Sequence, residues 1–380
     1  MKVGFDAKRL FNNFTGLGNY SRFIVSALQA AYPHDQYALF TPRVKSNAET
    51  RPFLDDPQLQ TILPPGWMSS LKLGSVWRSF LSGASVAKAG VELYHGLSHE
   101  LPRNLPSSIK QVVTVHDLIF LRYPQFYKSL DVKIYKAKVS HACQVADRVV
   151  AISRQTAEDI TTYLGIPVHQ IDVVYQGTHP VFSKTYTPAE IAAIRSRYNL
   201  PAEYILNVGT LEERKNAVLI VEALAMLPES LRIPVVLVGK ETDYLRKIKD
   251  AAHKHGVDRY IIALHNVTFA DLPALYQQAR VFVYPSLFEG FGIPLIEAIQ
   301  SGVPVITSQD SCFSEAAGPH AVYIDPHRSD DLAAGLHRVL SDGVFAATMV
   351  QDSRRYIERF QPGVVAAAMH GVYEKVLKGR

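Results

Sequence analysis

Short apolar runs rich in β-branched residues alternate with longer helical patterns along most of the chain. The runs lack polar alternation, which is typical of parallel strands covered by helices on both faces. They predict strands at residues 2–6, 37–41, 91–95, 111–115 and 148–152, and then at 204–209, 234–239, 281–284 and 303–307. The pattern breaks after residue 152 and restarts at Tyr204, which favours two doubly wound α/β domains over one large sheet.

The boundary between the domains is predicted within residues 175–198, where Gly177, Pro180 and Pro188 stand among polar residues. The predicted organisation is a domain at 1–178, a domain at 179–359 and a final amphipathic helix at about 360–380. The fold class is α/β, with two Rossmann-like domains facing a cleft. Open sheets of this kind bind ligands beyond the carboxyl ends of their strands, so we expect the site there.

The composition is that of an ordinary globular chain, with 47% hydrophobic and 20% charged residues. No apolar run approaches the roughly 20 residues that span a bilayer, and no basic-then-apolar leader opens the chain, so we expect it in the cytoplasm. Two cysteines, Cys143 and Cys312, suit a reducing compartment. A net charge of +5 is compatible with an anionic substrate or membrane surface but is too small for a dedicated nucleic-acid binder.

The most informative motif follows the predicted strand 281–284. Gly290 and Gly292 permit a tight turn, and Pro294 is predicted as the first residue of a helix. The amides of Phe291, Gly292 and Ile293 are therefore expected at a helix N-terminus, where they would bind a phosphate or an oxyanion.

Two carboxylates frame this motif, because Glu289 lies in the predicted loop and Glu297 in the helix, with seven residues between them. One could accept hydrogen bonds from sugar hydroxyls and the other from a ribose diol. The alternative is an ordinary strand–turn–helix with two solvated glutamates.

A second motif follows the predicted strand 204–209. Gly209 permits a ligand to approach the strand end, and Arg214 and Lys215 offer a forked donor and a compact cation to a polyanion. Together with the amides near Ile293 they would form a two-sided diphosphate clamp. The alternative is a surface pair of cations. The phosphate loop of kinases and ATPases, Gly-x-x-x-x-Gly-Lys-Ser/Thr, is not present.

Gly16 and Gly18 resemble a dinucleotide fingerprint only superficially, because Ser21 takes the place of the final glycine. We expect a flexible glycine loop that touches a ligand. His116 and Asp117 follow the predicted strand 111–115, where His116 is either a polar substrate contact or a structural histidine.

Other features carry less chemistry. Ser153 is expected to cap a helix, and His253 and His255 to be solvated. The sequence has no Asp-x-Asp, His-Glu-x-x-His or Cys-x-x-Cys pattern, so neither a metal site nor a cofactor is predicted.

Residues 66–90 combine aromatic and aliphatic side chains with Lys72, Arg78 and Lys88 and hold no acidic residue. They could contact an anionic headgroup layer or a lipid-linked acceptor, and thus the inner membrane. The alternative is an ordinary helix packed on the sheet.

Together these residues resemble a retaining glycosyltransferase of family 4 with the two-domain GT-B fold. The segments 4–9, 15–22 and 115–124 resemble the mannosyltransferase-like members that build bacterial surface polysaccharides. The resemblance covers nearly the whole chain and rests on residues 289–297, 209–216, 16–18, 314–318 and His116. Thr15-Gly16-Leu17-Gly18 replaces the family's Gly-Gly loop, and the family's glycine near Phe269 is missing.

The resemblance implies roles for individual residues. Glu289 would contact the hydroxyls of the donor sugar and Glu297 the ribose, while Arg214 and Lys215 would hold the diphosphate. His116 would touch the sugar, and the residues around Val267 would border the base. Gly16, Gly18, Gly209 and the amides of 291–293 would complete the donor site, and the final helix would cross back onto the first domain.

The function expected is metal-independent transfer of a hexose, with retention, from a nucleotide-sugar to a hydroxyl of a glycan or lipid-linked acceptor. GDP-mannose is favoured over a UDP-sugar as the donor. Two alternatives remain, a nucleotide-sugar epimerase of the same architecture and a non-catalytic protein that binds a sugar nucleotide.

Overall fold

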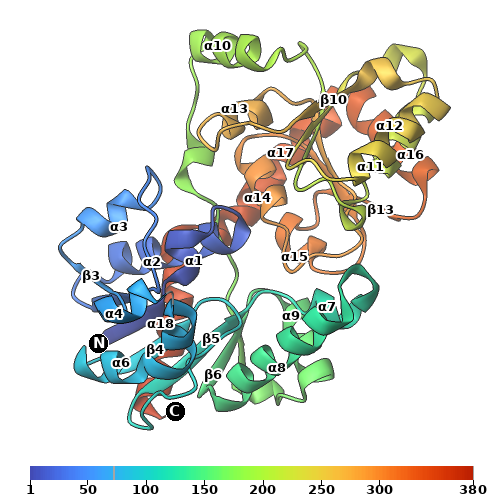
Figure 1. Ribbon diagram of the computed structural model, residues 1–380. Coiled ribbons are helices and arrows are strands. Elements are labelled where there is room, and N and C mark those ends of the chain that lie inside the picture. The colour runs from blue at the N-terminus through green and yellow to red at the C-terminus, as the bar shows by residue number, and fades with distance from the viewer. Residues whose placement is uncertain (72, 380) are drawn as a thin grey trace. The chain divides into compact units, whose positions relative to one another are not determined.

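The structure, a computed structural model, describes residues 1–71 and 73–379 (Figure 1). The chain forms two compact units, one made of Met1–Gly177 with Phe360–Arg380 and the other of Thr178–Arg359. Each unit has a parallel sheet between helices, as the alternation of strand and helix predicts. We describe each unit by itself.

The first unit is built on a seven-stranded sheet of order β3-β2-β1-β4-β5-β6-β7 in which every pairing is parallel. Its strands are β1 (Lys2–Asp6), β2 (Gln36–Phe40), β3 (Leu59–Ile62), β4 (Leu93–Gly96), β5 (Lys110–Val115), β6 (Arg148–Ala151) and β7 (Ile171–Val173).

Helices cover both faces of this sheet. They are α1 (Lys8–Asn12), α2 (Gly16–Ala31), α3 (Arg51–Asp55), α4 (Gly66–Ser70), α5 (Gly74–Val76), α6 (Gly83–Lys88), α7 (Ile119–Arg122), α8 (Ser129–Val145), α9 (Arg154–Leu164) and α18 (Pro362–Lys378). Short helical turns are η1 (Trp77–Leu81), η2 (Pro124–Phe126) and η3 (Val168–Gln170).

The final helix α18, red in Figure 1, packs against α2 of the first unit, as predicted. Its inner face buries Val365, Met369, Val372 and Tyr373. The hydroxyl of Tyr373 hydrogen-bonds Nδ1 of the buried His95 on β4 at 2.6 Å. An apolar stripe with one polar contact at its centre thus fixes α18 to the sheet.

The second unit has a six-stranded parallel sheet of order β10-β9-β8-β11-β12-β13. Its strands are β8 (Ile205–Val208), β9 (Val235–Val238), β10 (Ile261–Leu264), β11 (Val281–Tyr284), β12 (Val305–Ser308) and β13 (Val322–Ile324). Its helices are α10 (Pro188–Tyr198), α11 (Ala217–Met226), α12 (Tyr244–Lys254), α13 (Leu272–Gln277), α14 (Ile293–Gln300), α15 (Phe313–Ala317), α16 (Ser329–Ser341) and α17 (Gly343–Ile357). Helical turns are η4 (Pro180–Ser183), η5 (Glu213–Lys215), η6 (Glu229–Leu231), η7 (Asp258–Tyr260) and η8 (Glu358–Phe360).

Four strands were not predicted, namely β3, β7, β10 and β13, and all four are edge strands of their sheets. The central strands β9 and β11 are buried at every residue, whereas β10 is half-buried throughout. An edge strand is covered on fewer sides, so its sequence needs no continuous apolar run and gives a weaker signal.

The packing of α18 gives a test of stability. Met369→Ala should lower the free energy of unfolding by about 2–5 kcal/mol, because it leaves a cavity between α18 and the sheet. Val364→Ala, on the exposed side of the same helix, should change it by less than about 0.5 kcal/mol. Urea denaturation measures both, and equal effects would contradict the packing described.

Candidate active site

Two neighbouring parallel strands, β8 and β11, end beside a cluster of charged side chains. Nζ of Lys215, in the turn after β8, donates to Oη of Tyr284 and to Oε1 of Glu289, both at 2.6 Å. Nη1 of Arg214 lies 2.8 Å from Oε2 of Glu289 and donates to the carbonyl of Phe288 at 2.6 Å. The structure therefore brings together residues from two motifs that the sequence singled out separately.

Burial and opposite charge set the protonation of this cluster. Glu289 is 9% exposed. Burial alone would raise the pKa of its carboxyl, but the positive charges of Lys215 and Arg214 outweigh this and lower the pKa to about 2. Burial and the neighbouring Arg214 lower the pKa of Lys215, while Glu289 opposes that shift. Glu289 is thus ionised at neutral pH and is not a solvated glutamate.

The two cations retain donor capacity for a further anion. The Lys215 ammonium has three N–H groups, of which the hydrogen bonds to Tyr284 and Glu289 use two. The Arg214 guanidinium has five, and it contacts Glu212, Phe288 and Glu289. A diphosphate could therefore bind without breaking the ion pairs.

Hydrogen bonds to backbone carbonyls hold the turn after β8 against the loop after β11. Asn216 has φ 57°, and its Nδ2 donates to the carbonyls of Pro285 (3.2 Å) and Pro326 (2.8 Å). The amide of Leu287 donates to the carbonyl of Arg214 at 2.9 Å. Sequence reasoning assigned no role to Asn216, although asparagine is among the residues that tolerate a left-handed backbone.

Gly209 follows β8 and has φ 151°, a conformation that residues with side chains rarely adopt. A Cβ there would meet Cε of Lys215 at 3.5 Å, an ordinary contact. The backbone conformation, rather than a lack of space, therefore requires this glycine.

The loop after β11 leads into α14 as predicted. Gly292 has φ 106° and precedes the first helical residue, Ile293, so the helix begins one residue before the predicted start at Pro294. Phe291 and Gly292 are buried. The amides of residues 291–293 thus lie at the start of this helix, and their binding of an anion stays a prediction.

Glu297 lies inside α14 in a different environment from Glu289. It is 8% exposed, and its Oε2 accepts a hydrogen bond from Oη of Tyr276 on α13 at 3.0 Å. Burial raises the pKa of its carboxyl to about 7, because no cation compensates the charge as at Glu289. The two carboxylates of the motif therefore differ in charge near neutral pH.

In the first unit, His116 follows β5 and is buried. Its Nε2 lies 2.9 Å from the carbonyl of Leu97, and the ring of Tyr20 stands edge-on to the imidazole at 4.6 Å. Burial lowers the pKa of His116 to about 3, so the ring is neutral. Because a carbonyl only accepts, Nε2 carries the proton and Nδ1 is left as a hydrogen-bond acceptor.

The expectation of a flexible glycine loop is wrong, because Gly16 and Gly18 lie in the first turn of α2. The side chain of Asn13 fixes this turn by accepting from the amide of Gly18 at 3.0 Å. A Cβ on Gly18 would approach the Asn13 carbonyl to 1.7 Å, whereas Gly16 faces open space. Contact of either glycine with a ligand stays a prediction.

The smaller predictions have clear outcomes. Ser153 caps α9 by accepting from the amide of Thr156 at 3.0 Å, as predicted. The side chain of His253 is 89% exposed, and His255 at the end of α12 is exposed, also as predicted. Val267 is half-buried in the loop between β10 and α13, and its contact with a base remains untested.

Residues 66–90 differ in part from the expectation of a basic, aromatic surface. Trp77 is buried in the core, and Arg78 is buried in ion pairs with Asp6 and Glu100. Neither can reach a headgroup layer. Lys72 lies outside the described residues.

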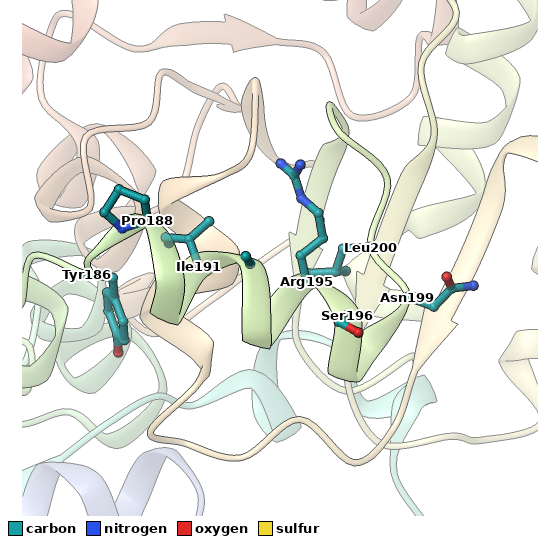
Figure 2. A pocket seen from close by; sticks show the side chains of 8 residues that line it. Tyr186, Pro188, Ile191, Arg195, Ser196, Asn199 and Leu200 are labelled. Atoms are coloured by element: carbon teal, nitrogen blue, oxygen red, sulfur yellow. The ribbon is translucent and has the colours of Figure 1, made fainter.

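A cavity of about 520 Å³ runs along α10 (Figure 2). It is lined by Tyr186, Pro188, Ile191, Ala192, Arg195, Ser196, Asn199 and Leu200. None of these belongs to the cluster around Glu289, so chemistry and not concavity identifies the candidate site. Within residues 1–71 and 73–379, no helix is long and apolar enough to cross a membrane, and no three His, Cys, Asp or Glu side chains are grouped to hold a metal ion.

Two models of known protein families match the chain. The family model of glycosyl transferases group 1 matches residues 190–358, and that of glycosyltransferase family 4 matches residues 15–181. The chain belongs to the family 4 glycosyltransferases. It is therefore a glycosyltransferase, and its fold is GT-B.

The relatives include O-antigen chain mannosyltransferase B of Escherichia coli, 27% identical over 90% of this chain and 91% of that protein. The serotype-specific mannosyltransferase WbdA of Escherichia coli is 31% identical over 62% of this chain, which spans only 30% of WbdA. Among solved structures, a sucrose-phosphate synthase from Thermosynechococcus elongatus superposes with a TM-score of 0.76 at 20% identity, over the whole of both chains. That similarity concerns the fold alone.

The raised pKa of Glu297 makes a prediction about pH. The ordinary pKa of Glu297 is 4.5, and its pKa in the folded protein is about 7. At pH values between these two, the folded glycosyltransferase holds a proton on Glu297 that the unfolded chain has lost, so the free energy of unfolding falls as pH rises. Glu297→Gln removes this penalty. The free energy of unfolding of the variant, relative to the parent, should rise by about 2–3 kcal/mol from pH 5 to pH 8.

Urea denaturation at the two pH values measures this difference. Glu203→Gln, an exposed carboxylate in the same unit, is the control and should show no such trend. A difference between parent and Glu297→Gln that is the same at both pH values would contradict a buried, protonated Glu297.

Proposed function

We propose that this glycosyltransferase moves a hexose, with mannose favoured, from a nucleotide-sugar to a hydroxyl of a glycan or lipid-linked acceptor. The reaction proceeds with retention and without a metal ion, and it serves the synthesis of a surface polysaccharide. The observation that carries the proposal is the cluster of Arg214, Lys215 and Glu289 at the ends of β8 and β11. The two mannosyltransferase relatives support mannose, and with it GDP-mannose over a UDP-sugar, as the donor.

Charge determines the mechanism. When the bond between sugar and diphosphate breaks, negative charge grows on the departing phosphate. The remaining N–H groups of Arg214 and Lys215, with the amides at the start of α14, stabilise that charge. One such donor contributes about 3–4 kcal/mol to lowering a barrier. No metal ion is needed for this step.

The carboxylate of Glu289 and the neutral imidazole of His116 suit the sugar. Both present acceptors, and a sugar hydroxyl is a donor. The incoming hydroxyl gives its proton to the leaving phosphate oxygen on the same face of the sugar, which produces retention. No side chain has to act as a covalent nucleophile.

Two other activities are compatible with the same donor site. An epimerase would isomerise the nucleotide-sugar without an acceptor, and a binding protein would hold it without turnover. Incubation with donor alone distinguishes the epimerase, because only that enzyme yields an isomerised nucleotide-sugar.

Variants of the cluster test the proposal. Lys215→Ala and Glu289→Ala should each lower kcat by 100-fold or more, because each removes a group that acts on the departing phosphate or on the sugar. Lys249→Ala, an exposed lysine on α12, should retain full activity. Circular dichroism confirms folding, and wild-type turnover in both site variants would refute these assignments.

The donor and the absence of a metal are tested together. Calorimetric titration with GDP-mannose, UDP-glucose and UDP-galactose should give the tightest binding for GDP-mannose. Transfer should persist in EDTA, and strict dependence on a divalent ion would contradict the cationic clamp.

Membrane contact through residues 66–90 also remains part of the proposal. The apolar side chains Trp67, Leu71, Phe80 and Leu81 are between 47% and 64% exposed. The helix α8 buries residues in the same core cluster as Trp77, so these segments cover one face of the sheet. An apolar surface of this kind suits the interface of a membrane that holds a lipid-linked acceptor.

The exposed side of α8 carries side chains of the same kind. Leu130, Ile134 and Tyr135 are exposed there beside Lys133 and Lys136. Apolar side chains flanked by lysines are typical of helices that lie in an anionic headgroup layer.

Vesicle sedimentation tests this contact. The protein should bind phosphatidylglycerol vesicles at least tenfold more tightly than phosphatidylcholine vesicles. The double variants Trp67→Ser/Leu71→Ser and Lys133→Glu/Lys136→Glu should lose that binding, whereas Lys249→Glu/Lys254→Glu on α12 should keep it. Equal binding by all variants would exclude this surface.

A further inference from the structure

The short segment between β4 and β5 that begins at Leu97 has a strained residue beside His116. His99 has φ 61°, in the left-handed region where a side chain meets steric penalty. Its imidazole is half-buried, and the ring centroids of His99 and His116 are 5.3 Å apart at 46°. Such strain persists only where surrounding contacts hold it, and it gathers at functional sites.

Contacts on both sides fix this conformation. The amide of His99 donates to the carbonyl of Thr114 on β5 at 2.9 Å. The next residue, Glu100, is tied by its carboxylate to the buried Arg78 and to Lys138. A Cβ on Gly96 would come within 2.2 Å of the Glu100 carbonyl, so the chain folds back tightly on the end of β4.

The same segment determines the tautomer of His116. The carbonyl of Leu97 accepts from Nε2 of His116 at 2.9 Å, which leaves Nδ1 without a proton. Tyr20 packs edge-on against the imidazole of His116, with ring centroids 4.6 Å apart, and His99 is the second aromatic neighbour of that imidazole. The imidazole of His116 is thus held by a hydrogen bond and two rings.

The imidazole of His99 itself has no hydrogen-bond partner in the part of the chain that the structure describes. Burial lowers the pKa of His99 to about 4, so both rings are neutral and do not repel each other at physiological pH. A residue that is strained, held in place by others and in ring contact with His116 is poorly explained by packing alone.

We propose that His99 is a positioning residue for His116. Its left-handed backbone keeps the Leu97 carbonyl on Nε2 of His116, and its ring limits rotation of the imidazole. Nδ1 of His116 is then aimed, without a proton, at a hydroxyl of the donor sugar. This inference rests on the proposed contact between His116 and the sugar.

Two variants test the proposal without adding backbone strain. His99→Gly and His99→Asn both tolerate the left-handed conformation but remove the imidazole. We expect kcat to fall about tenfold in each, with the affinity for GDP or UDP, whichever the parent binds more tightly, unchanged in calorimetry. Asn199→Gly replaces another left-handed residue, at the end of α10, and should leave kcat unchanged.

Nitrogen-15 NMR of the histidine side chains supplies a readout that a merely structural role would not move. In the parent, His116 should show one tautomer with the proton on Nε2, and in His99→Gly and His99→Asn a mixture of the two. The variant His116→Ala identifies the signal and gives the reference activity.

Each outcome has a distinct meaning. A proton on Nδ1 of His116 in the parent would overturn the proposal whatever the variants do. Turnover within twofold of the parent in both His99 variants, while His116→Ala is inactive, would overturn it and leave the proposed function standing. Full turnover of His116→Ala would instead remove His116 from the proposed donor site, and this inference with it.

Discussion

A carboxylate held between two cations at the ends of neighbouring strands is the interaction on which the site depends. Glu289 is almost fully buried, and an isolated charge there would be strongly unfavourable. Lys215 and Arg214 compensate it, and in doing so they tie the turn after β8 to the loop after β11. The cations that neutralise this carboxylate are the same groups that we propose bind the diphosphate of a donor.

The backbone around this cluster is fixed before any substrate arrives. Asn216 and Gly292 take left-handed conformations, and hydrogen bonds to Pro285 and Pro326 hold the first of them. Preorganised donors are effective because they need no reorganisation when charge develops in the transition state. The rigid parallel strands behind them supply that preorganisation.

The two units differ in the kind of group that they offer. The second unit presents charge, in Arg214, Lys215 and the ionised Glu289. The first presents a neutral imidazole, His116, whose burial keeps it uncharged. Both side chains are buried, but Glu289 has cationic partners that keep it charged, whereas His116 has no partner of opposite charge strong enough to keep it protonated.

The sequence by itself determined the class of fold, the central strands and the residue types of the charged cluster, because continuous apolar runs and glycine-containing turns are local signals. It missed the edge strands, whose partial exposure weakens the apolar pattern, and it mistook the first turn of α2 for a flexible loop. Only the tertiary structure decided that Arg78 is buried in ion pairs, that the pKa of Glu289 is lowered while that of Glu297 is raised to about 7, and which nitrogen of His116 carries the proton. Those properties depend on desolvation and on partners distant in the chain, which no local pattern of residues specifies.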